Sequence, residues 1–98
     1  MIYKLNGPKN PSKVRIDVKK AGEAKFKALD FVVSCFEANN YELRNGLDAI
    51  LAYHALNVEK RQRDKSISEW VDEFNKADLQ WVWNYLEKNR FVELVKEN

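Results

Sequence analysis

The chain has 98 residues with a formal net charge of +2, and 45% of its residues are hydrophobic, which fits one globular domain and excludes an intrinsically disordered chain. No apolar run approaches the ~20 residues that span a bilayer, the start lacks the apolar segment of a secretory signal, and one cysteine and one histidine exclude an internal disulfide and disfavour a zinc cluster. We therefore expect a single cytoplasmic domain over residues 1–98, with no metal, no cofactor and no membrane partner.

The first 20 residues are predicted to form a basic β-hairpin. Residues 2–5 have the composition of a short strand, and residues 6–12 contain a glycine and both prolines of the chain, which is typical of a loop. Over 14–19, apolar and charged residues alternate, and a period of two indicates a half-buried strand. We therefore expect two strands joined by a long basic loop.

Four helices are predicted over 21–89. The first, over 21–39, has an apolar arc of roughly 220° at 100° per residue, so most of its surface is expected to be buried. The second, over 42–63, has one apolar stripe and, on its opposite side, another formed by Ala49, Ala52, Tyr53 and Leu56. Two stripes suggest a central helix with neighbours on two sides. Gly46 costs about 1 kcal/mol relative to alanine in such a helix and alternatively marks a break.

The remaining residues are predicted to form a short helix, a longer helix and a strand. Ser66 and Glu69 have capping-box spacing, and a short amphipathic helix follows, which includes Phe74. Residues 76–89 place their apolar side chains on one helical face, and residues 91–95 resemble a closing strand. The predicted fold is a small, mostly helical α+β domain with about four helices and a two- or three-stranded sheet, which combines the N-terminal hairpin with the C-terminal strand.

Charge is unevenly distributed along the chain. Residues 1–27 contain eight basic and two acidic side chains, a net charge of +6, whereas residues 28–98 contain nine basic and thirteen acidic ones, a net charge of −4. Such a basic end favours an anionic partner, for example nucleic acid. The candidate phosphate contacts are Lys9, Lys13, Arg15, Lys19, Lys20, Arg61, Arg63 and Lys65. The alternatives are ordinary solvated lysines and, near residue 61, cations that complement a helix dipole.

Catalytic chemistry has little support in this sequence. Cys35 and His54 are the only candidates for a nucleophile and its base, but both fall within apolar arcs of predicted helices, where they are expected to be core residues. The carboxylates Glu69, Asp72 and Glu73 are expected on a solvated helix face. No glycine-rich phosphate loop, nucleophile elbow or metal motif is present, so we do not expect an enzyme.

Aromatic residues are concentrated late in the chain. Trp70 and Trp83 fall on predicted core stripes, whereas Trp81 and Tyr85 lie on the other shoulder of the helix over 76–89, next to Lys88. If exposed, this group is suited to stacking on bases or to anchoring a protein partner. If buried against the hairpin, it is additional core.

The order short helix, turn, longer helix and strand over 66–95 resembles the segment of a winged-helix domain in which the recognition helix leads into the wing. The residues that carry this resemblance are Trp83-Asn84-Tyr85-Leu86-Glu87-Lys88-Asn89-Arg90-Phe91-Val92-Glu93-Leu94. The resemblance implies that Gln80, Asn84 and Lys88 point outward, toward base edges and phosphates. The sequence departs from the pattern because no second wing strand follows 91–95 and because several carboxylates would lie near phosphates.

Two functions are consistent with these features. The first is a non-enzymatic nucleic-acid-binding or regulatory module that uses the basic residues and the helix carrying Trp81. The alternative is a protein-binding inhibitor, immunity or assembly adaptor protein that is anchored by Trp81 and Tyr85. A homodimer through this aromatic surface is a further option that no sequence feature selects. Convergence of the basic side chains on one face of the fold would favour the first function.

Overall fold

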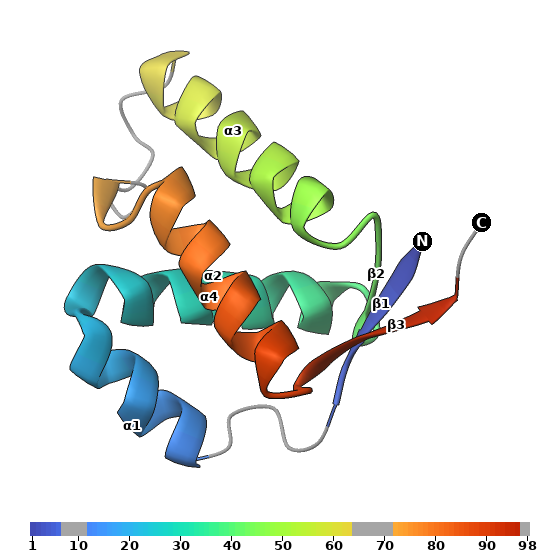
Figure 1. Cartoon of the computed structure of the whole chain (residues 1–98). Helices are drawn as coiled ribbons and strands as arrows, with labels where there is room; N and C mark the ends of the chain where they lie inside the picture. Colours follow the sequence, from blue (N-terminus) through green and yellow to red (C-terminus); the bar gives the residue numbers. More distant parts are fainter. Residues whose placement is uncertain (7–11, 64–71, 97–98) are drawn as a thin grey trace.

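The computed structural model describes residues 1–6, 12–63 and 72–96. Seven elements follow one another along the chain: β1 (Ile2–Leu5), α1 (Ser12–Ala21), α2 (Glu23–Ala38), β2 (Glu42–Arg44), α3 (Leu47–Arg63), α4 (Lys76–Lys88) and β3 (Val92–Lys96). Figure 1 shows the helices on one side of a small sheet that contains both β1 and β3, the first and last elements. Within the described ranges, no helix is long and apolar enough to cross a membrane.

The sheet is antiparallel and has the order β2-β1-β3. The N-terminal strand is therefore central: Tyr3 pairs with Leu43 on one side and with Leu94 on the other. Leu5, Leu43 and Val92 are the buried side chains of the three strands. The α+β fold class, with about four helices and a sheet that includes the C-terminal strand, is confirmed, although the four described helices are not the four predicted ones.

The predicted second strand of the hairpin, over 14–18, is wrong because this segment is α1. Val14 and Val18 are buried, one helical turn apart, whereas Ile16 is 55% exposed. A Val-x-x-x-Val spacing fits a helical period as well as a period of two, and α1 forms where its two valines pack against α2. The partner of β1 is instead β2, which the sequence analysis placed in a helix.

The helix predicted over 42–63 begins only at Leu47, because the chain turns at Gly46. This glycine has φ +52°, a conformation that L-residues rarely adopt. A Cβ atom at Gly46 would lie 2.5 Å from Cδ2 of Tyr3 and 2.9 Å from Cζ2 of Trp83. The alternative that Gly46 marks a break is thus confirmed. The short helix predicted over 66–74 falls largely outside the described residues; Phe74 is buried but does not belong to a helix.

The core is centred on α2, which contacts both α1 and α4. Leu29, Val32 and Phe36 of α2 are almost completely buried. Phe36 stacks on Trp83 of α4, with 6.1 Å between the ring centroids and 7° between the ring planes. On the other edge of the same indole, Tyr3 makes a T-shaped contact at 5.2 Å. Trp83 therefore joins the helices to the sheet, as its core assignment predicted.

Candidate functional site

The N-cap of α4 fixes where this helix begins, and its buried residues show which of its sides faces the solvent. Asn75 is the N-cap residue: its side chain accepts a hydrogen bond from the Asp78 amide, and the Asp78 carboxylate accepts one from the Asn75 amide. The sequence analysis missed this capping box, although the Asn-x-x-Asp spacing is visible in the sequence. Four apolar residues of α4 face the core, namely Leu79, Val82, Trp83 and Leu86.

Gln80, Asn84 and Lys88 are exposed on the opposite side of α4, as predicted. The Gln80 amide donates a hydrogen bond to the Asn84 side-chain oxygen over 3.2 Å, one turn apart. The exposed side of α4 is thus polar and carries both charges, because Glu87 is also exposed there, seven residues after Gln80 and three after Asn84.

Trp81 and Tyr85 form one half-buried aromatic pair on the shoulder of α4. Their rings stack with 5.6 Å between centroids and 9° between planes. The Lys25 ammonium, from the first turns of α2, lies 5.6 Å from the Trp81 ring centroid and also pairs with Asp78 at 3.6 Å. Both rings are partly exposed and also pack against the core. The pair is therefore neither the fully exposed group nor the fully buried one that the sequence left as alternatives.

The Tyr85 hydroxyl ties α4 to α1. It donates a 2.8 Å hydrogen bond to Oδ2 of Asp17, a residue 68 positions earlier in the chain. Desolvation, followed by the hydrogen bond to Asp17 and the negative charge of that carboxylate, raises the pKa of Tyr85 from 10 to about 12. The phenol therefore remains a protonated donor at physiological pH. No sequence pattern pointed to Asp17, because the contact exists only in the folded chain.

Two of the predicted cations lie one helical turn from Asp17, the residue to which Tyr85 donates its hydrogen bond. Lys13 precedes Asp17 by four residues and Lys20 follows it by three, so all three side chains share one side of α1. Both lysines are exposed, and neither forms an ion pair within the described residues. At the end of α4, Lys88 joins Trp81, Asn84 and Tyr85 around a hollow of about 250 Å³.

We call the surface formed by Lys13, Lys20, Lys25, Trp81, Asn84, Tyr85 and Lys88 the α1–α4 face. Other predicted cations do not join it. Arg15 and Lys19 lie on the opposite flank of α1, over the Phe26 ring at 4.8 and 5.6 Å from its centroid, and Arg15 also pairs with Asp30 at 3.4 Å.

Arg61 and Arg63 are also separate from this face, at the C-terminal end of α3. Figure 1 shows that end at the top of the molecule and α1 at the bottom. Arg61 forms an ion pair with Asp72. Lys9 and Lys65 lie outside the described residues. The candidate phosphate contacts therefore do not all converge on one face: those that the structure describes are divided among the α1–α4 face, the flank of α1 over Phe26 and the end of α3.

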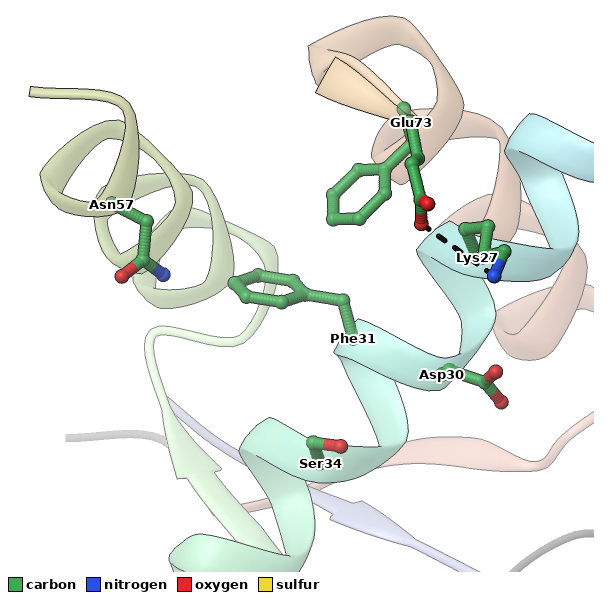
Figure 2. Close-up of a pocket in the computed structure, with 7 residues that line it drawn as sticks. Lys27, Asp30, Phe31, Ser34, Asn57 and Glu73 are labelled. Atoms are coloured by element: carbon green, nitrogen blue, oxygen red, sulfur yellow. Dashed lines mark ion pairs between the residues drawn. The ribbon is translucent and has the colours of Figure 1, made fainter. Parts of the chain in front are cut away.

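A second region of interest lies between α2 and α3. Two hollows of about 380 and 450 Å³ share Phe31, Ser34 and Asn57 as lining residues. Figure 2 shows the first of them, with Phe31 reaching from α2 toward α3 and the Lys27–Glu73 ion pair, 3.5 Å long, at its rim. The sequence assigned Phe31 to a buried arc and Glu73 to a solvated face, so it gave no indication of a groove.

Cys35 and His54 also lie in this region between α2 and α3. Cys35 is buried on α2, and burial raises the pKa of its thiol from 9 to about 11, so at neutral pH it is a protonated, unreactive group. The His54 ring packs at 6.1 Å from Phe31 and 5.2 Å from Phe74, measured between centroids. Among the described residues, no group of three or more histidine, cysteine and carboxylate side chains is arranged to hold a metal ion.

No protein-family model, curated protein or solved structure was found to match the chain significantly.

Proposed function

We propose that the protein binds nucleic acid through the α1–α4 face and does not catalyse a reaction. The observation that carries this proposal is the hydrogen bond between Tyr85 and Asp17. It connects the side of α1 that carries the exposed Lys13 and Lys20 to the helix of the aromatic pair, which contributes Asn84 and Lys88 to the hollow beside the rings. Cations next to half-exposed rings are the combination that contacts phosphates and stacks on bases.

The electrostatics of α1 support this assignment. Lys13 and Lys20 have no carboxylate partner within the described residues, so their charges are available to phosphates. Arg15, Lys25 and Lys27 form ion pairs with acidic residues of this chain. Two of the three exposed lysines of α1 that form no ion pair with a described residue, Lys13 and Lys20, thus share the side of Asp17, whereas Lys19 lies on the opposite flank over Phe26.

The position of α4 also supports it. In the winged-helix resemblance, α4 corresponds to the recognition helix, and its exposed residues Gln80, Asn84 and Lys88 are the ones expected to face a groove. The strand that follows α4, β3, pairs antiparallel with β1.

The first test is binding to a labelled duplex and to a single strand at about 50 and 200 mM salt. We expect micromolar affinity at the lower salt and a steep decrease at the higher. The double variant Lys13→Ala/Lys20→Ala should weaken binding about 10-fold and reduce the slope of log affinity against log salt by about 2, since each lysine releases roughly one counterion.

The matched control is Lys60→Ala/Arg63→Ala, which removes the same charge from the distant end of α3. It should leave affinity nearly unchanged. An equal loss in both double variants would show that only total charge matters and would refute the α1–α4 face. Absence of binding at the lower salt would refute nucleic-acid binding and favour the alternative of a protein partner anchored by Trp81 and Tyr85. A preference for the single strand would assign the aromatic pair to base stacking.

A further inference from the structure

The hollow on α4 is bounded by the aromatic pair, Asn84 and Lys88, and has a volume of about 250 Å³. At 100° per residue, Trp81 and Lys88 lie about 20° apart around the helix, with Tyr85 about 40° to one side of Trp81 and Asn84 about 60° to the other. The four side chains therefore form one strip along α4. The hollow is smaller than the roughly 300–1,000 Å³ of most small-molecule pockets, so it suits a single planar group such as one nucleobase.

The two rings beside this hollow are held in position by other helices. Tyr85 donates its 2.8 Å hydrogen bond to Asp17 of α1. The Lys25 ammonium of α2 lies 5.6 Å from the Trp81 ring centroid and is itself paired with Asp78. Side chains that are fixed before binding lose little conformational entropy when a ligand stacks on them. The aromatic pair is therefore a preformed stacking surface.

A ring can stack on a base only where that base exposes a π face. In a duplex each base is covered by its neighbours, whereas unpaired bases can be splayed out and stacked on aromatic side chains. A helix that reads a duplex instead inserts its outward residues into a groove. On α4 this would bring Glu87, which is exposed beside Gln80, close to phosphates. Glu87 lies about 120° around the helix from Trp81, so a strand bound on the aromatic side avoids this carboxylate.

The polar groups around the rings are those that an unpaired nucleotide requires. Asn84 offers an amide donor and acceptor for a base edge, and Lys88 offers an ammonium group for an adjacent phosphate. Toward α1, Asp17 shares its side of that helix with the exposed Lys13 and Lys20, which supply further phosphate contacts.

We propose that the α1–α4 face binds single-stranded nucleic acid, with one unpaired base stacked on the aromatic pair in the α4 hollow and the neighbouring phosphates on Lys88 and the lysines of α1. This inference rests on the proposed function and specifies which form of nucleic acid the face takes.

The test compares four labelled ligands of equal length at about 50 mM salt: a DNA strand, an RNA strand, a duplex, and an abasic DNA strand that keeps the phosphates without the bases. We expect the base-containing single strands to bind at least about tenfold more tightly than the abasic strand and more tightly than the duplex. The tighter of the DNA and RNA strands identifies the preferred sugar, and either result supports the inference.

Equal affinity for the abasic and base-containing strands, or a duplex that binds as tightly as the single strands, would overturn the inference and leave the proposed function standing. Absence of binding to all four ligands would refute both.

A variant of the stacking ring tests the same point. Trp81→Ala should weaken binding of the base-containing strand at least about tenfold and leave the affinity for the abasic strand unchanged. The matched control is Tyr53→Ala, which removes another partly exposed ring (39%) from α3 and should change neither affinity. A folded Trp81→Ala variant that distinguishes the two strands as well as the wild type would overturn the inference.

Trp81 also packs against the core, so circular dichroism checks the fold of Trp81→Ala, and a milder variant provides a second readout. Trp81→Phe keeps an aromatic ring and should retain most of the affinity for the base-containing strand. Stacking of a base should quench tryptophan fluorescence in the wild type, and the quenching should be smaller in Trp81→Phe. Equal quenching in the two chains would exclude stacking on this ring.

Discussion

At the scale of single residues, Tyr85 has the largest influence on how the candidate face is assembled. Its ring stacks on Trp81, and its hydroxyl fixes α1 through Asp17. A tyrosine at this position could be predicted to be near-surface from helical spacing, but its partner could not. Asp17 was expected on a strand, and a hydrogen bond between residues so distant in the chain leaves no local pattern.

We predict that Tyr85→Phe lowers the free energy of unfolding by about 1 kcal/mol at pH 7, the usual contribution of one hydrogen bond. Because folding raises the pKa of Tyr85 from 10 to about 12, the neutral phenol is favoured in the folded state. The stabilisation is therefore fully present below pH 10 and is lost as the pH rises toward 12. Urea unfolding at pH 7 and at pH values between these limits measures this difference.

The control for this prediction is Tyr53→Phe, which removes an exposed hydroxyl from α3 and should change stability little. Absorbance titration of tyrosinate provides a second readout. The wild type should show an ionisation with a midpoint of about 12 that is absent from Tyr85→Phe. Identical titration curves for the two chains would contradict the raised pKa.

At the scale of secondary-structure elements, the period of the apolar residues predicted some elements correctly and one incorrectly. The apolar stripe of α4 and the composition of β3 predicted both elements correctly; α4 has one buried face with a helical period, whereas β3 buries only Val92 among its described side chains. The segment over 14–18 was mispredicted because two valines four residues apart satisfy both periods. Only packing against α2 decides between them, and that contact is not local.

We predict that α3 is the least protected helix against amide hydrogen exchange. Six residues of α2 are buried but only Ile50 of α3 is, so local opening of α3 exposes little apolar surface. At protein concentrations near 10 µM, amides in the second half of α3 should exchange at least about 100-fold faster than those in the centre of α2. Exchange measured by NMR or mass spectrometry tests this. Protection of α3 equal to that of α2 at low concentration would contradict the prediction of a loosely attached helix.

At the scale of the whole molecule, strands from the two ends of the chain pair with each other in one sheet. β1 is the central strand, and β3 pairs with it. Leu5 is 7% exposed at the end of β1 and faces Val92 across the ladder. The sequence analysis predicted that the C-terminal strand would complete the sheet but assigned β1 a sequential partner, as in a hairpin. The actual neighbours of β1 come from residues 42–44 and 92–96.

We predict that Leu5→Ser lowers the free energy of unfolding by about 2–4 kcal/mol, because it removes buried apolar volume and introduces a hydroxyl into the core. Lys4→Ser is the matched control on the same strand, since Lys4 is exposed, and it should cost less than about 0.5 kcal/mol. Thermal or urea unfolding compares the two. Equal losses would show that strand propensity, and not the core contact of Leu5, dominates.

Gly46 left a continuous helix and a break both open in the sequence, but the fold class, the helix and strand near residues 76–96 and the outward direction of Gln80, Asn84 and Lys88 could be predicted from it. All of these follow from periodicity, composition and backbone preference within a few residues. The folded structure was needed to show which described cations form ion pairs, and that Asp17, which shares one side of α1 with Lys13 and Lys20, bonds to Tyr85. These features depend on contacts between distant segments, and such contacts form only when the whole core is packed.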